Sequence, residues 1–242
     1  MLSPLPVFVA LAGPSMGSFV CASAERMIAG VPVFTARSRC GGCRQALRPW
    51  DMVPLASWLW LRGRCRDCAA RIPVRLWGAE VAGGAIGIAS AVGAPGWLAL
   101  ASALFGWALL WLALLDLGAM WLPRVGGWGL AAAGLGVAAL LGPDALDAGA
   151  IGAVAGWAVL AGVGLVFARV RGQDGLGEGD PPLLAAAGAW VGWRGLPLVV
   201  LIAACTAIAH ALLAGGGRAR RVPFGAHLAL AMFVVWLAGS PL

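Results

Sequence analysis

The sequence predicts an all-α polytopic membrane protein with about eight transmembrane helices and one small water-facing insertion. Of its 242 residues, 61% are hydrophobic and 11% are charged, whereas typical soluble domains have roughly 45–50% and about 25%. The mean hydropathy is +0.89, and a spanning helix needs only about 20 apolar residues. This composition excludes a soluble enzyme that carries a single tail anchor.

The first apolar run, residues 5–24, is expected to be the first transmembrane helix, within a first region of residues 1–24. Ala22-Ser23-Ala24 has the small residues of a signal-peptidase site. A cleaved signal has a positively charged segment before its apolar run, but here the arginines follow the run. We therefore expect an uncleaved anchor whose N-terminus lies outside the cell.

Apolar runs return after a polar segment and predict a seven-helix membrane domain over residues 77–242. Turns that contain Gly, Pro or charged residues separate these runs. The run at 182–193 is too short to cross the membrane upright, so the helix is expected to include flanking residues. The expected spans are residues 79–95, 97–115, 128–142, 148–168, 182–193, 196–214 and 223–240.

The basic residues predict the orientation of these spans. All 17 are arginines, and basic residues concentrate on the cytoplasmic side of membrane proteins. Placing residues 25–76 in the cytoplasm puts every arginine except Arg194 on that side. The connections then carry Arg124, Arg169, Arg171, Arg218, Arg220 and Arg221. We expect both termini on the outer face of the membrane, with membrane lipid around the spans.

Residues 25–76 form the predicted water-facing domain, which contains four of the six cysteines. Cys40 and Cys43 form one C-x2-C pair, and Cys65 and Cys68 form a second. This spacing is close to that of a zinc ribbon, and four thiolates can close a structural Zn2+ site that helps a small segment to fold. A metal-free or redox-active tetrad is the alternative. Catalytic zinc is disfavoured because four cysteine ligands leave no open position.

Two acidic residues stand at expected helix ends, and ionisable groups in spans are candidates for function. Asp116 ends one apolar run, and Asp180 follows the glycine-rich turn that contains Gly177 and Gly179. Two carboxyls that meet in a bundle share a proton, so one can activate water while the other polarises a carbonyl. The alternative is that each aspartate only caps a helix. Glu80 pairs with a nearby arginine or lines a substrate groove, and we expect His210 and His227 to form hydrogen bonds inside the bundle.

Several short motifs occur in a fixed order along the chain. They are Gly17-Ser18-Phe19, the cysteine segment 37–68, Glu80, Leu115-Asp116 with Leu122-Pro123, Gly177-Glu178-Gly179-Asp180, and Val222-Pro223-Phe224-Gly225. In this order they resemble the motifs of the bacterial type IV prepilin peptidases, which are aspartyl proteases of the GxGD type, and the resemblance runs almost from end to end.

The resemblance implies that Asp116 and Asp180 are the catalytic pair, and that Gly177, Gly179 and Glu80 are candidates for the substrate groove. It implies cleavage of type IV prepilins or type II secretion pseudopilins after the leader glycine, on the cytoplasmic side. It also implies zinc on the four cysteines and S-adenosylmethionine as the donor that N-methylates the new terminus. No nucleic-acid partner is expected, because topology and the zinc domain account for the arginines.

Two positions depart from the family pattern and define a rival interpretation. Pro182 stands where the family usually has a lysine, and Arg124 stands where it usually has an aspartate. Both candidate catalytic aspartates are present. The rival is a noncatalytic assembly factor that binds prepilins through the same groove.

Overall fold

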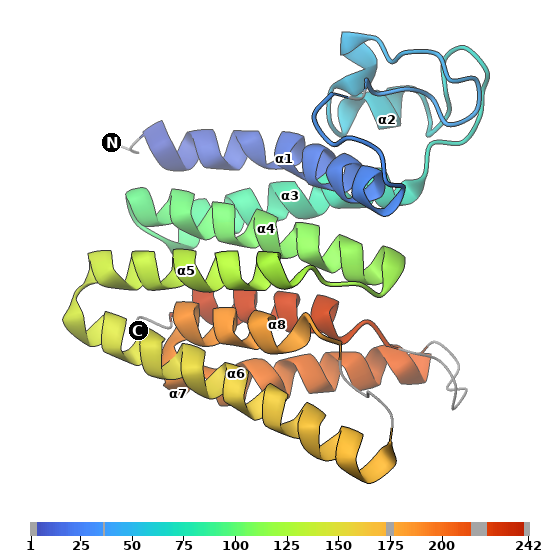
Figure 1. Ribbon diagram of the computed structural model, residues 1–242. Coiled ribbons are helices and arrows are strands. Elements are labelled where there is room, and N and C mark those ends of the chain that lie inside the picture. The colour runs from blue at the N-terminus through green and yellow to red at the C-terminus, as the bar shows by residue number, and fades with distance from the viewer. Residues whose placement is uncertain (1–3, 36, 173–176, 214–221, 240–242) are drawn as a thin grey trace. The chain divides into compact units, whose positions relative to one another are not determined.

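The computed structural model describes residues 4–35, 37–172, 177–213 and 222–239, and these form helices without any strand longer than an isolated bridge (Figure 1). The arginines expected at 218, 220 and 221 lie outside the described residues. The all-helical class is confirmed. Within the described part of the chain, six helices are long and apolar enough to cross a membrane. The helices are α1 (Pro4–Ile28), α2 (Ala56–Trp60), α3 (Val74–Gly93), α4 (Trp97–Ala119), α5 (Arg124–Leu141), α6 (Pro143–Arg171), α7 (Asp180–Leu213) and α8 (Phe224–Leu237).

The chain divides into two compact units, residues 1–111 and 112–242. The first unit contains α1, the cysteine segment and α3, together with most of α4. The second contains the end of α4 and all later helices. Asp116, Gly177, Gly179 and Asp180 lie in the second unit, whereas Glu80 and the four cysteines of the tetrad lie in the first.

Helices α1 and α3 pack directly against each other through small residues. In lipid, no hydrophobic force drives helices together, so close backbone approach supplies much of the attraction. A Cβ on Gly83 would lie 2.6 Å from the Cα of Gly17. Only glycine fits at this crossing. Trp107 on α4 adds a hydrogen bond from its indole N–H to the carbonyl oxygen of Gly83, at 3.0 Å.

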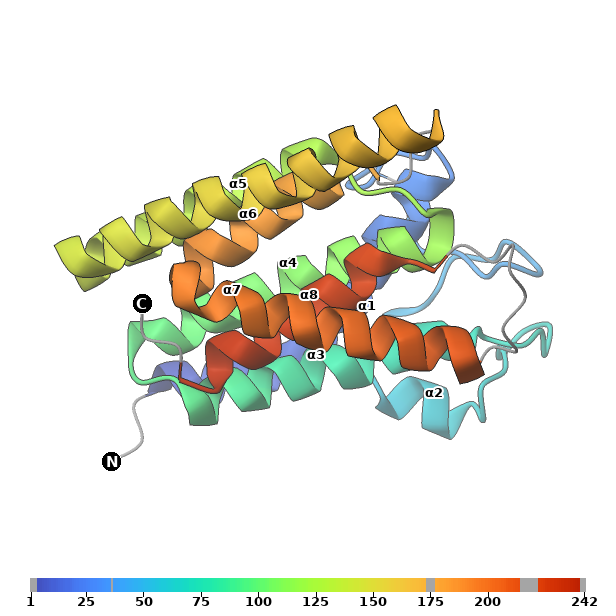
Figure 2. The same cartoon turned by 90° about the horizontal axis from the view of Figure 1, so that it is seen from below.

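Helix α7 is the central element of the second unit and packs against α5, α6 and α8. It contains one non-helical residue, Gly192, with φ 68° and ψ 172°. Figure 2 shows the two parts of α7 doubling back at this point. The two short runs expected at 182–193 and 196–214 are therefore the two arms of α7. The first arm is almost fully buried, whereas α6 exposes most of its surface, as expected for a helix that faces lipid.

Helix α8 has 14 residues and is apolar, but it is shorter than the six candidate spans. Its predicted range, 223–240, extends past the helix at the C-terminal end. The helix begins at Phe224 because Pro223 lacks a backbone N–H and favours the residue before a helix start. This start matters for the site, since the first turn of α8 carries backbone donors.

The α1–α3 crossing can be tested with two valine substitutions on the same helix. We expect Gly83→Val to lower the free energy of unfolding by at least about 2 kcal/mol, because the new side chain overlaps the α1 backbone. Gly78→Val is the matched control, since a Cβ at Gly78 meets no atom within 4 Å. Unfolding in mixed detergent micelles, followed by circular dichroism, measures both. Equal loss in the two variants would contradict the proposed crossing.

Candidate functional site

The four cysteines of the first unit come together as one cluster. Their Sγ atoms all lie within 4.8 Å of one another, and the Cys40 and Cys68 sulfurs are 3.7 Å apart. A tetrahedral zinc with Zn–S bonds of about 2.3 Å places its sulfurs about 3.8 Å apart. The donor set and its spacing therefore fit Zn2+ bound by Cys40, Cys43, Cys65 and Cys68.

The backbone around the first C-x2-C turn prepares one ligand for a metal. The N–H of Gly42 points at the Sγ of Cys40, at 3.4 Å. Hydrogen bonds from the backbone of Cys43 and Gly42 lower the pKa of the Cys40 thiol to about 6. Since the thiolate is the form that binds metal, Cys40 presents its binding form near neutral pH.

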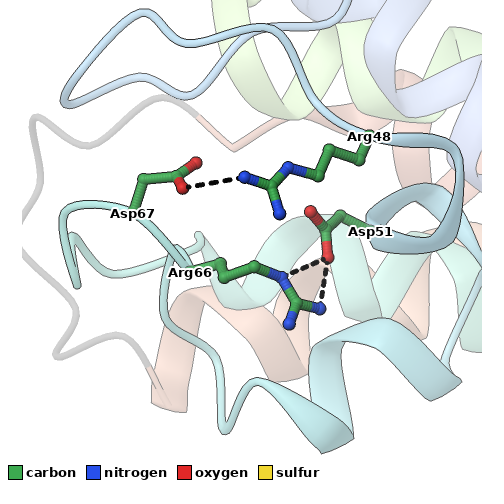
Figure 3. A network of polar contacts seen from close by, with 4 residues as sticks. All are labelled: Arg48, Asp51, Arg66 and Asp67. Carbon is green, nitrogen blue, oxygen red and sulfur yellow. Dashed lines mark hydrogen bonds and ion pairs between the residues drawn. The ribbon is translucent and has the colours of Figure 1, made fainter.

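Ion pairs on the two intervening residues of the second C-x2-C turn hold it in place (Figure 3). Arg66 donates from Nε and from a terminal nitrogen to one oxygen of Asp51, at 3.1 and 2.7 Å. Asp67 lies 3.5 Å from Arg48. The Asp51 side chain is only 8% exposed, whereas the Arg48 and Asp67 side chains are 49% and 40% exposed. The Arg66–Asp51 pair is therefore the stronger of the two, because buried pairs are screened less by water.

Glu80 is also in the first unit, where both of its carboxylate oxygens have partners. Ser18 on α1 donates its hydroxyl to Oε1 at 2.8 Å, and the backbone N–H of Leu55 donates to Oε2 at 2.7 Å. Glu80 is buried. In this structure the carboxylate joins the cysteine segment to α1 and α3.

Asp116, near the C-terminal end of α4, is buried and held by the first turn of α8. Its Oδ2 accepts a hydrogen bond from the backbone N–H of Ala226 at 2.9 Å. Only 6% of Asp116 is exposed. The first turn of a helix has backbone N–H groups without intrahelical partners. Asp116 is the acceptor for one of these groups in α8.

Asp180 is the first residue of α7 and is also buried, with 7% exposed. Its Oδ2 accepts a hydrogen bond from the N–H of Gly177 at 3.1 Å. Its own N–H donates to the carbonyl oxygen of Gly177, also at 3.1 Å. This reciprocal pair closes the glycine-rich turn around the Asp180 carboxyl.

Leu122, in the connection between α4 and α5, lies between the segments that hold the two aspartates. A Cβ on Gly179 would overlap Leu122, and so would a Cβ on Gly225. Gly179 precedes Asp180, and Gly225 precedes the donor to Asp116. A Cβ on Gly225 would also lie 3.0 Å from Oδ2 of Asp116, and a Cβ on Gly177 would lie 3.1 Å from Oδ2 of Asp180. The structure therefore brings Asp116, Asp180, Gly177 and Gly179 together, whereas Glu80 belongs to the other unit.

Pro182 and Arg124, which depart from the family pattern, both lie in the second unit. Pro182 is buried against α5, where a Cβ on Gly127 would lie 2.7 Å from the Cβ of Pro182. Arg124 lies 3.4 Å from Glu178, and both side chains are largely exposed.

His210 on α7 and His227 on α8 form a hydrogen bond, with Nδ1 of the first 3.0 Å from Nε2 of the second. This agrees with the expectation that they are bundle residues. His227 directly follows Ala226, the donor to Asp116. The pair therefore connects the second arm of α7 to the turn of α8 that holds the carboxylate.

Known proteins match nearly the whole chain. The bacterial peptidase A24 N-terminal domain matches residues 11–93, and the type IV leader peptidase family matches residues 103–212. The chain belongs to the type IV leader peptidase family. No solved structure matches it.

Three similar proteins carry the name prepilin leader peptidase/N-methyltransferase. The protein from Aeromonas hydrophila is 39% identical over 209 residues, which cover 84% of this chain and 72% of the relative. The protein from Burkholderia pseudomallei strain 1026b is 41% identical over 85% of this chain and 68% of the relative. The protein from Stutzerimonas stutzeri is 35% identical over 90% of this chain and 77% of the relative.

Sequence reasoning did not predict the parts of the leader peptidase site that hold the aspartates in place. Leu122, Gly225 and Ala226 contribute packing and a backbone donor, which leave no chemical signature in a sequence. The motifs containing Leu122-Pro123 and Pro223-Phe224-Gly225 were the available signal.

The Arg66–Asp51 and Arg48–Asp67 ion pairs are expected to contribute unequally to zinc retention. Asp51→Asn removes the charged acceptor of both Arg66 hydrogen bonds and is expected to loosen the second C-x2-C turn. A chelator should then remove zinc about tenfold faster or more. Asp67→Asn breaks only an exposed pair and should cost less than about 1 kcal/mol. Zinc release to a chromogenic chelator from the purified protein measures both, and equal rates in the two variants would refute the ranking.

Proposed function

We propose that this leader peptidase family member is an intramembrane aspartyl endopeptidase that cleaves prepilin-type leaders, with Asp116 and Asp180 as its catalytic carboxyls. The observation that carries the proposal is the convergence of these two buried carboxyls within one unit, each held by a backbone N–H. The names of the relatives supply the substrate class.

The proposed chemistry follows from the burial and proximity of the two carboxyls. Two carboxyls that interact in a dry site hold one proton between them. The ionised carboxyl removes a proton from water as the water attacks the peptide carbonyl, and the protonated carboxyl donates a hydrogen bond to the carbonyl oxygen. The proton then passes to the leaving amine as the C–N bond breaks. The Gly177 and Ala226 N–H groups keep the two carboxyls oriented through these steps.

Methylation is the proposed second reaction of the same protein. S-adenosylmethionine, when bound, would supply the methyl group that the new N-terminal amine accepts. The relatives' name supports this activity.

The proposed side of cleavage is the cytoplasmic face of the bacterial inner membrane, and the substrates are type IV prepilins or type II secretion pseudopilins. In the second unit, Asp116 and Asp180 stand at helix ends near connections that also carry Arg124 and Arg171. Basic connections favour the cytoplasmic side. The catalytic carboxyls would then meet leaders that still extend into the cytoplasm.

A noncatalytic assembly factor is the second candidate, and Pro182 and Arg124 favour it. Against it, Pro182 fits against Gly127 without displacing Asp180, and Arg124 forms only an exposed ion pair. The site is therefore compatible with catalysis despite both departures.

The decisive experiment is cleavage of a prepilin leader from the same organism by the purified protein in liposomes. Asp116→Asn and Asp180→Asn should each lower the rate by about 10²–10⁴-fold, the usual contribution of a positioned acid or base. Asp147→Asn is the matched control, since Asp147 is exposed on α6, and it should cleave as the wild type does.

Mass spectrometry of the product separates the candidates. Cleavage after the leader glycine, with one added methyl group only when S-adenosylmethionine is present, would establish both activities. A folded wild type that binds the leader but leaves it uncut would overturn the peptidase proposal in favour of the assembly factor.

A further inference from the structure

The second C-x2-C turn places two arginines side by side on a short β-hairpin. Arg64 and Arg71 form an antiparallel bridge. The flanking hydrogen bonds run from Cys65 N–H to the Ala70 oxygen and from Ile72 N–H to the Gly63 oxygen, each at 2.8 Å. Arg64 and Arg71 are therefore a non-hydrogen-bonded pair, the position where cross-strand side chains lie closest and on one face, with Cα atoms about 4.5 Å apart.

Like charges at this position destabilise a hairpin, and the described residues offer no carboxylate to relieve the repulsion. The three acids of the segment pair with other arginines. Asp51 binds Arg66, Asp67 binds Arg48, and Glu25 binds Arg75. Both Arg64 and Arg71 are exposed, so an anion from outside the chain can reach them.

The position of the pair indicates where that anion comes from. Arg71 precedes the first residue of α3, Val74, by three positions, and three residues span at most about 10 Å. Helix α3 is a candidate membrane span. On α2, just before the hairpin, Trp60 is 84% exposed and Leu59 is 59% exposed. Exposed tryptophan beside basic residues is typical of the membrane–water interface.

We infer that Arg64 and Arg71 form a clamp for the phosphate of an anionic lipid headgroup, which holds the cysteine domain against the bilayer surface. Guanidinium groups bind phosphate oxygens in bidentate fashion. The cytoplasmic leaflet is rich in anionic lipid. This inference rests on the proposed cytoplasmic placement of the cysteine domain, but not on the peptidase activity, because it involves neither aspartate.

The cysteine domain is attached to membrane helices at both ends, which favours lipid over a soluble anion as the ligand of the arginine pair. The cysteine domain is continuous with α1 at one end and α3 at the other. Headgroups are therefore always present at a high effective concentration, whereas free phosphate or a nucleic acid must be captured from solution.

The test is hydrogen exchange of residues 61–73 in the full-length, zinc-loaded protein in nanodiscs. One set of discs contains only phosphatidylcholine, and the other contains phosphatidylcholine with about a third phosphatidylglycerol. Two arginines near an anionic surface are expected to slow exchange of this segment by about thirtyfold in the anionic discs. High salt should reduce the effect.

Three variants distinguish the clamp from general positive charge. Arg64→Gln with Arg71→Gln should abolish the difference between the discs. Arg37→Gln with Arg44→Gln removes equal charge from the exposed surface of the first C-x2-C segment and should preserve it. Arg64→Glu should also abolish it, while creating an ion pair with Arg71 that stabilises the hairpin. This last variant separates loss of lipid binding from loss of folding.

Several results would overturn the inference. Equal loss in the two double variants would assign the effect to net charge. Equal exchange of residues 61–73 in the two kinds of nanodisc, in the wild type, would exclude anionic lipid as the ligand. Protection in phosphatidylcholine discs by inorganic phosphate alone would indicate a soluble-anion site, and protection there by a single-stranded RNA would indicate a nucleic-acid site.

Discussion

The geometry of the aspartyl site depends on one side chain, Leu122, which lies against Gly179 and Gly225. These glycines come from segments far apart in the sequence, the turn before α7 and the first turn of α8. Each is followed directly by a functional group of the site: the Asp180 carboxyl and the N–H that binds Asp116. A β-carbon at either glycine would push Leu122 away and separate the two aspartates. The glycine of the GxGD motif therefore serves packing as well as turn formation.

The same packing rule governs both units, although only one contains the aspartates. In lipid, attraction between helices comes from close contact rather than from exclusion of water. Gly17 and Gly83 allow α1 to meet α3, and the buried first arm of α7 is rich in alanine. The aspartates sit where this close packing already excludes lipid, so their polar groups find backbone donors instead of hydrocarbon.

Much of this architecture was predictable because it depends on composition and local pattern. The apolar runs predicted the helices, and the two C-x2-C pairs predicted the cysteine cluster. Asp116 and Asp180 stood out because charge is rare in spans. The partners of these residues were not predictable. That Ala226 holds Asp116, and that Leu55 holds Glu80, depends on contacts between distant segments, and a backbone N–H looks the same at every position.

The structure divides the arginines into two groups that the sequence alone does not distinguish. Their distribution among the predicted connections indicated orientation, and any of them could have been a solvated surface charge. The structure separates those that neutralise buried or nearby carboxylates, such as Arg66 with Asp51, from those with no acidic partner among the described residues. Arg64 and Arg71 belong to the second group and also face each other across a hairpin. A repulsive pair beside a membrane helix is stable when an anion lies between its members, so the surrounding lipid becomes part of the folded domain's electrostatic balance.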